Sequence, residues 1–184
     1  MHVARSQGGY VTARQARAVG CTGAQIRAGL TRGTLQRAHG NLVRLASWPI
    51  GPFDEYAKWC AWFEGAAAIS HQSAAQLHGL GRLSPRLMHL SAAGGPRPEV
   101  PDVAVRRVRL PESDIDSTGS FAVTTPVRTI LDLAGAGIAQ HMLDEVVGDA
   151  LAIARVEADQ LAAAATAASG RVERRVSAAL SATC

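Results

Sequence analysis

Arginine side chains are concentrated at the front of this chain, where aspartate and glutamate are absent. The first 53 residues contain seven arginines, and the first acid is Asp54. The remaining 131 residues carry 12 basic and 15 acidic residues, so the formal net charge of +4 divides into +7 and −3. Guanidinium groups pair with phosphate oxygens, and a cationic module attracts the backbone of DNA. The charge pattern predicts a small DNA-binding module ahead of a mildly acidic body.

Four residues at the start of one predicted helix have side chains or backbone suited to reading bases. They are Thr22, Gly23, Gln25 and Arg27. When the second helix of a helix-turn-helix enters the major groove, its first residues meet base edges; Gln pairs with adenine and Arg with guanine. Further residues are expected near phosphates: Arg14, Arg17, Arg32, Arg37 and His39. A helix-turn-helix also packs against proteins, so a protein-docking module is the alternative.

Local sequence signals place these residues on two short helices. A threonine followed by glutamine three residues later is a capping box, and this pattern occurs at Thr12 and at Thr22. Gly20 and Gly33 end the two helices. The apolar side is expected to consist of Ala16 and Val19 in the first helix, and of Ile26 and Leu30 in the second.

A β-hairpin is expected directly after the second helix. Residues 34–37 and 42–45 flank a glycine-bearing turn at residues 38–41. A helix-turn-helix followed by a hairpin is a winged helix-turn-helix, which we assign to residues 1–47. Residues 2–9 are compatible with a short additional helix.

The rest of the chain predicts an α+β body over residues 54–184, after a proline-containing linker at 46–52. Strands are expected at 67–70, 87–91, 103–110 and 121–124, and helices at 54–64, 72–80 and 126–134. Pro126 begins the last of these, with Thr125 as its N-cap. Further helices are expected at about 138–154, 156–168 and 171–181.

Few other residues suggest chemistry. His71 and His78 invite a metal or catalytic role, with Asp132 as a further candidate, but neither a zinc motif nor a nucleophile elbow is present. We therefore expect no enzyme activity, no metal and no cofactor, and keep a metal-dependent enzyme as the less favoured alternative. Arg106, Arg107 and Arg109 suit a solvated sheet edge or a supplementary phosphate contact. The three cysteines, Cys21, Cys60 and Cys184, fit no disulfide framework.

No run of 18 apolar residues predicts a membrane span, and the N-terminus lacks the apolar core of a signal peptide. We expect a cytoplasmic protein that does not contact a membrane.

Three segments resemble the AbiEi family, the antitoxins of type IV toxin–antitoxin systems. The first is G-G-Y-V-T-A-R-Q-A-R-A-V-G at residues 8–20, together with N-L-V-R-L at 41–45. The second is S-H-Q-S-A-A-Q-L-H-G-L at 70–80, and the third is V-T-T-P-V-R-T-I-L-D-L-A at 123–134. The similarity spans roughly residues 8–150.

The resemblance implies a winged helix-turn-helix that binds inverted repeats of double-stranded DNA in its own promoter, and a second domain that supports cooperative operator binding and the antitoxin effect. It implies DNA contacts on residues 22–31 and 37–41. The cognate toxin would be a nucleotidyltransferase-like protein that the antitoxin need not touch. Two departures stand out: Asn41 precedes the last wing strand where the family usually has glycine, and many relatives continue into a domain that resembles a very-short-patch-repair nuclease. A complete antitoxin, a shortened relative and a lone regulator all stay open.

Overall fold

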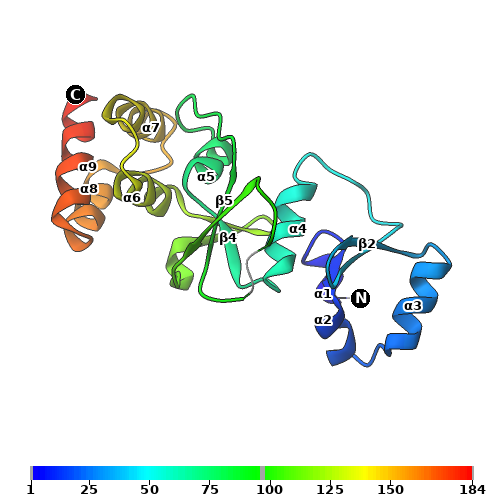
Figure 1. The fold of residues 1–184 in the computed structure, drawn as a ribbon. Helices are drawn as coiled ribbons and strands as arrows, with labels where there is room; N and C mark the ends of the chain where they lie inside the picture. Colours follow the sequence, from blue (N-terminus) through cyan, green and yellow to red (C-terminus); the bar gives the residue numbers. More distant parts are fainter. Residues whose placement is uncertain (1, 96–97, 184) are drawn as a thin grey trace.

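The protein has an α+β fold with two small sheets and a helical C-terminal part, as the sequence predicts. The computed structural model describes residues 2–95 and 98–183. Figure 1 shows three groups of elements in a row, with the N-terminal helices and hairpin at one end, the larger sheet in the middle and the C-terminal helices at the other end.

The N-terminal elements are α1 (His2–Arg5), β1 (Tyr10–Thr12), α2 (Ala13–Ala18), α3 (Gly23–Thr31), β2 (Leu35–His39) and β3 (Leu42–Leu45). Both predicted capping boxes are confirmed, because Thr12 and Thr22 each accept a hydrogen bond from the backbone of the glutamine three residues later. Each cap stabilises its helix by about 1 kcal/mol. The interpretation of these elements as a winged helix-turn-helix stays a prediction.

Three details of this part differ from the sequence prediction. Strand β1 was not expected; it pairs antiparallel with β3, with Tyr10 opposite Arg44. Val19 was assigned to a buried stripe, but it is 62% exposed and is the C-cap of α2, outside the helix. The hairpin turn is shorter than expected, because β2 extends to His39 and leaves only Gly40, with φ of 50°, and Asn41 between the strands.

The central part is built on a five-stranded sheet in the order β6-β5-β4-β8-β7. Its strands are β4 (Ala67–Ile69), β5 (Met88–Ala92), β6 (Val103–Arg107), β7 (Ile115–Ser117) and β8 (Ala122–Thr124), and its helices are α4 (Asp54–Trp62) and α5 (His71–His78). Strand β7 and the short 3-10 helix η1 (Glu112–Asp114) before it were missed in the sequence, since each has only three residues.

Four helices follow: α6 (Pro126–Ala136), α7 (Gln140–Ala152), α8 (Ala158–Ala167) and α9 (Gly170–Ala182). Thr125 is the N-cap of α6 and Pro126 lies in its first turn, as predicted. The abundant alanines allow close approach of these helices, and Val146, Leu161 and Val176 are fully buried among them.

Hydrophobic contacts cross the predicted boundary between residues 47 and 54. A small cluster under the first two capped helices contains Ala16, Ile26 and Val43. Tyr10 and Leu42, however, belong to the cluster of the central sheet, together with Trp59 of α4 and other residues. A third cluster lies among α6–α9. The front module is therefore packed on the body rather than tethered to it by a free linker.

Two further points concern the described residues only. None of their helices is both long and apolar enough to cross a bilayer. Cys21 is half-buried and Cys60 is buried, both as free thiols. Cys184 and Pro96 lie outside the described residues.

Candidate nucleic-acid interface

Three of the predicted DNA-binding arginines surround one hollow. Arg17 of α2, Arg27 of α3 and Arg37 of β2 line a concavity of about 280 Å³ between the two helices and the hairpin. Gly23 and Asn41 also line it, and no acidic side chain does. All three arginines are exposed, and α3 lies at the end of the molecule remote from the C-terminal helices (Figure 1). The hollow is therefore an accessible, cationic surface.

Local backbone chemistry orients the start of α3. The amide of Thr22 donates to Oε1 of Gln25 at 2.7 Å, and Oγ1 of Thr22 accepts from the amide of Gln25 at 3.2 Å. The carbonyl oxygen of the Gln25 side chain is thus occupied by the cap. This bond fixes the orientation of the Gln25 side chain, and its amide nitrogen is still a donor.

The turn of the hairpin is held by Arg37. Nη1 of Arg37 donates to the carbonyl oxygen of Gly40 at 3.0 Å, across the turn of the β2–β3 hairpin. This bond leaves the remaining guanidinium donors free. Arg32, the C-cap of α3, is exposed but does not line the hollow, so its predicted phosphate contact would lie at the other end of the helix.

Arg14 has a partner that the sequence did not predict. Its side chain forms an ion pair with Glu64, and Nε of Arg14 donates to Oε1 of Glu64 at 2.9 Å. The same carboxylate oxygen accepts from Oγ1 of Thr12 at 2.6 Å. Glu64 follows α4 and so belongs to the body. The sequence alone did not predict that it lies beside Arg14. Arg14 is exposed but already has a carboxylate partner, and it does not line the hollow with Arg17, Arg27 and Arg37.

His39 has packing partners that the sequence did not predict. It was predicted to lie near phosphates, but its ring is half-buried against two tryptophans of α4. The ring centroids lie 5.1 Å from Trp59 and 4.9 Å from Trp62, both in edge-to-face geometry. A β-bulge between Arg37 and His39 shifts the register of the strand pair just before this residue. His39 therefore packs the hairpin on the body, and its phosphate contact stays a prediction.

Arg44 is a structural arginine. Only 6% of its surface is exposed, Nη2 donates to the carbonyl oxygen of Trp48 at 2.6 Å, and Nε lies 3.6 Å from Oδ1 of Asp54. The other oxygen of Asp54 accepts from the hydroxyl of Tyr10 at 2.5 Å. The front arginines thus serve two purposes: some line the hollow, and Arg14 and Arg44 join the front module to the body.

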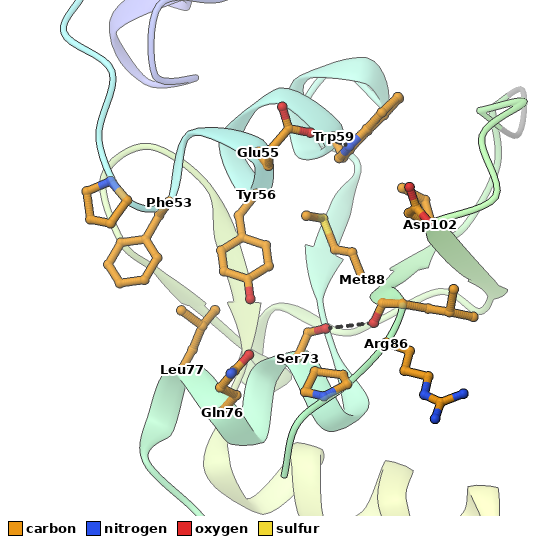
Figure 2. Close-up of a pocket in the computed structure, with 14 residues that line it drawn as sticks. Phe53, Glu55, Tyr56, Trp59, Ser73, Gln76, Leu77, Arg86, Met88 and Asp102 are labelled. Carbon is orange, nitrogen blue, oxygen red and sulfur yellow. Dashed lines mark hydrogen bonds between the residues drawn. The ribbon is translucent and has the colours of Figure 1, made fainter.

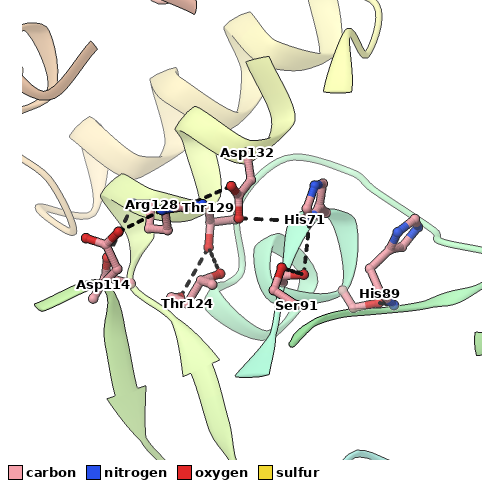
Figure 3. Close-up of polar contacts among 11 residues, drawn as sticks. His71, His89, Ser91, Asp114, Thr124, Arg128, Thr129 and Asp132 are labelled. Atoms are coloured by element: carbon pink, nitrogen blue, oxygen red, sulfur yellow. Dashed lines mark hydrogen bonds and ion pairs between the residues drawn. The ribbon is translucent and has the colours of Figure 1, made fainter. Parts of the chain in front are cut away.

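His71, one histidine of the alternative, enzymatic interpretation, lies in a buried polar network (Figure 3). Nδ1 of His71 lies 2.9 Å from Oγ of Ser70 and 3.9 Å from Oδ2 of Asp132. A serine–histidine–aspartate triad needs the serine and the carboxylate on opposite ring nitrogens. Here both face the same nitrogen, so the arrangement does not activate the serine.

Burial explains the charge state of this network. It lowers the pKa of His71 to about 4, with further contributions from Arg106, His89 and Arg128. Burial also raises the pKa of Asp132, against the opposing effect of Arg128. His71 is buried and does not line the arginine-lined hollow.

His78 lies apart from His71. Its Nε2 bonds to the carbonyl oxygen of Thr124 at 2.7 Å and joins α5 to β8. Among residues 2–95 and 98–183, no three His, Cys, Asp or Glu side chains are grouped so that they could hold a metal ion. His71 and His78 therefore do not form a joint ligand set.

The same network joins two of the segments on which the family resemblance depends. Arg128 donates to Asp132 and to Asp114, each at 2.8 Å, and Oγ1 of Thr129 lies 2.7 Å from that of Thr124 (Figure 3). The residues 70–80 and 123–134 meet through packing of α5 on α6, and β4, just before residue 70, pairs parallel with β8. Their polar residues build the body rather than an accessible site.

The arginines of β6 lie on an edge strand, as the sequence suggested. Arg106 and Arg107 are exposed, and Arg107 donates to the carbonyl oxygens of Gly94 and Gly95, each at 2.6 Å. This bonding pattern braces a loop. A supplementary phosphate contact by these arginines stays a prediction.

The comparisons with known proteins bear on the fold. No protein-family model and no curated protein matches the chain. Among solved structures, the RV2827C protein from Mycobacterium tuberculosis is similar, with a TM-score of 0.57 and 16% identity over 98% of this chain and 74% of that chain. At this identity the likeness shows a common fold over nearly the whole chain.

Proposed function

We propose that this protein is a sequence-specific DNA-binding protein whose residues 1–47 act as a winged helix-turn-helix. One observation carries the proposal: Arg17, Arg27 and Arg37 come together around an accessible hollow that no acidic side chain lines. Arginines from two helices and a hairpin around one concavity are suited to grip a phosphate backbone while α3 lies in the adjacent groove.

Charge and shape both support this use of the front module. Residues 1–53 contain no aspartate or glutamate. Glu64, a carboxylate of the body that contacts the front module, forms an ion pair with Arg14. The start of α3 presents Thr22, Gly23 and Arg27 beside the hollow, with backbone amides that carry partial positive charge. We assign base contacts to Arg27 and Gln25, and phosphate contacts to Arg17, Arg32 and Arg37.

The resemblance to the AbiEi antitoxins extends the proposal to a biological role. We propose an autorepressing, antitoxin-like regulator in the cytoplasm that binds inverted repeats in its own promoter. A nucleotidyltransferase-like toxin encoded nearby is the expected functional partner, without direct contact. The buried network that joins residues 70–80 to 123–134 supports a stable body for cooperative binding.

The test is a DNA-binding titration on the protein's own upstream DNA at several salt concentrations. One variant replaces Arg17, Arg27 and Arg37 with alanine. The control replaces Arg82, Arg155 and Arg174, three exposed arginines of the body and the C-terminal part, and changes net charge equally. Each lost phosphate contact reduces the slope of log affinity against log salt by about 0.9. We expect the hollow variant to lose about two such units, for the phosphate contacts of Arg17 and Arg37, and the control to keep the wild-type slope.

Two outcomes contradict the proposal. If both variants bind DNA equally well, the hollow is not the interface. If the folded wild-type protein shows no salt-dependent DNA binding, the helix-turn-helix serves as a protein-docking surface instead. Arg27→Ala can also be tested alone. If it weakens DNA binding and changes the preference for one base of the site, Arg27 contacts that base.

A further inference from the structure

A second hollow lies where the front module, the linker and the body meet. It has a volume of about 620 Å³, within the range of small-molecule sites. We call it the junction pocket; its apolar walls are Trp48, Phe53, Leu77 and Phe121, and its carboxylates are Asp54 and Asp116. It is separate from the arginine-lined hollow, with which it has no lining residue in common.

The backbone accounts for this space. Pro49 and Pro52 prevent the linker from continuing a helix or a central strand, so the chain arches over the body. Gly8, with φ of 61°, lies so close to α4 that an added Cβ would be 2.7 Å from Cβ of Ala57. The close approach of Gly8 and the arch of the linker together leave a concavity whose shape depends on all three segments.

The pocket has a preformed aromatic wall. The ring of Phe53 is stacked on Tyr56, at 6.1 Å between centroids, and meets Phe121 edge to face at 6.3 Å. Phe53 is nevertheless 50% exposed. An apolar or aromatic ligand in the pocket would cover this ring, and burying apolar surface is favourable.

Charged groups of one sign line the pocket. Asp54 and Asp116 are carboxylates, and no arginine or lysine is among the lining residues. Asp54 is already bound to Tyr10 and lies near Arg44. Asp116 is exposed, and among the described side chains none forms an ion pair with it. Asp116 is therefore the carboxylate available to a ligand.

A neighbouring hollow helps to define this preference. Phe53 and Leu77 line both hollows, and Figure 2 shows them beside Tyr56, Gln76 and the other residues of the neighbour. The neighbour has a volume of about 700 Å³ and carries Arg86 as well as Glu55 and Asp102. Its mixed charges favour neither sign, whereas the junction pocket favours a cation.

We propose that the junction pocket binds a small amine with an apolar, preferably aromatic, body. The ring lies against Phe53 and Phe121, and the ammonium group lies toward Asp116. This binding site is independent of the proposed DNA-binding function, because it is measured without DNA.

The test uses tryptamine as the probe, with indole-3-acetate as a matched anion, and isothermal titration calorimetry as the readout. We expect tryptamine to bind with a Kd below about 1 mM, a value in reach of a ligand of this size. We expect the anion to bind at least about threefold more weakly, since an exposed carboxylate contributes a modest charge preference.

Two pairs of variants locate the site. Asp116→Asn should weaken tryptamine binding by about threefold, while Asp159→Asn on the remote helix α8 should leave it unchanged. Ser120 lines the pocket and is half-buried. Ser120→Trp should fill the space and abolish binding, and Ser120→Ala should preserve it. A thermal melt of each variant establishes that it is folded.

The proposal is overturned if tryptamine does not bind the folded wild-type protein at millimolar concentration. It is also overturned if indole-3-acetate binds as well as tryptamine, or if folded Ser120→Trp binds tryptamine with unchanged affinity. A loss of DNA binding has no bearing on these outcomes, so the two proposals fail separately.

Discussion

Arg14 of α2 and Glu64, just after α4, are joined by an ion pair in which Nε of Arg14 donates to Oε1 at 2.9 Å. Glu64 has φ of 57°, a left-handed conformation that favours glycine. A glutamate in this conformation costs about 1 kcal/mol of stability relative to glycine. Its carboxylate offsets that cost by binding both Thr12 and Arg14, and it fixes the front module relative to the body.

This pair gives the first prediction. Glu64→Gln should raise the affinity for DNA about two- to fivefold at low salt, because Arg14 becomes free and one negative charge is removed near the interface. The glutamine still can accept from Thr12. Titrations with DNA measure the change, and Glu157→Gln, an exposed site near α8, is the control. Equal affinities for the two variants would show that Arg14 lies away from bound DNA.

His39 gives the second prediction. His39→Ala should lower the free energy of unfolding by about 1–2 kcal/mol, because two aromatic contacts with Trp59 and Trp62 are lost. Its slope of DNA affinity against salt should equal that of the wild type. Arg37→Ala, two residues away, should do the reverse, with a shallower slope and little loss of stability. Urea unfolding and salt titrations of DNA binding distinguish the two variants. A shallower slope for His39→Ala would show that His39 contacts DNA.

The third prediction concerns pH. The pKa of His71 is lowered from 6.5 to about 4 in the folded protein. Between these pH values His71 is protonated in the unfolded chain and neutral in the folded protein. The stability that depends on neutral His71 is complete above pH 6.5 and is lost as the pH falls from about 6.5 to about 4. The difference amounts to about 3 kcal/mol. Asn tolerates the positive φ of 53° at this position, so His71→Asn should remove this part of the pH dependence.

Urea unfolding at pH 7.5 and pH 4.5 measures this effect. The groups around His71 are Arg106, His89, Arg128 and Asp132, and all of them are present in both proteins. The comparison therefore isolates the histidine. An equal loss of stability in wild type and His71→Asn would mean that His71 is protonated in the folded state.

The fourth prediction concerns Arg128, which bonds to Asp114 and Asp132. Arg128→Ala should cost about 2–4 kcal/mol of stability, because it leaves the mostly buried Asp132 without its cation. Arg128→Lys should recover part of this loss, since one ammonium group cannot reproduce the two-sided guanidinium bonds. Asp114→Asn, at a more exposed site, should cost less than about 1 kcal/mol. Chemical unfolding measures these losses. A larger loss of unfolding free energy for Asp114→Asn than for Arg128→Ala would contradict this account.

Local signals in the sequence were sufficient for the short-range features of the fold. The capping boxes at Thr12 and Thr22, the N-cap at Thr125 and the hairpin near Gly40 each depend on residues within four positions of one another. The helices of the C-terminal part follow from alanine-rich, apolar periodicity. Such features form wherever the backbone permits them, so a single sequence predicts them.

The sequence also shows how many charged residues the front of the chain contains, but not which contacts their side chains make. The sequence determines that seven arginines precede the first acid. Only the tertiary structure decides that Arg17, Arg27 and Arg37 share a hollow, that Arg14 and Arg44 bind carboxylates of the body, and that His39 packs on tryptophans. These contacts join residues up to 50 positions apart. They depend on how β1, β3 and α4 pack, and packing depends on the whole chain rather than on any local pattern.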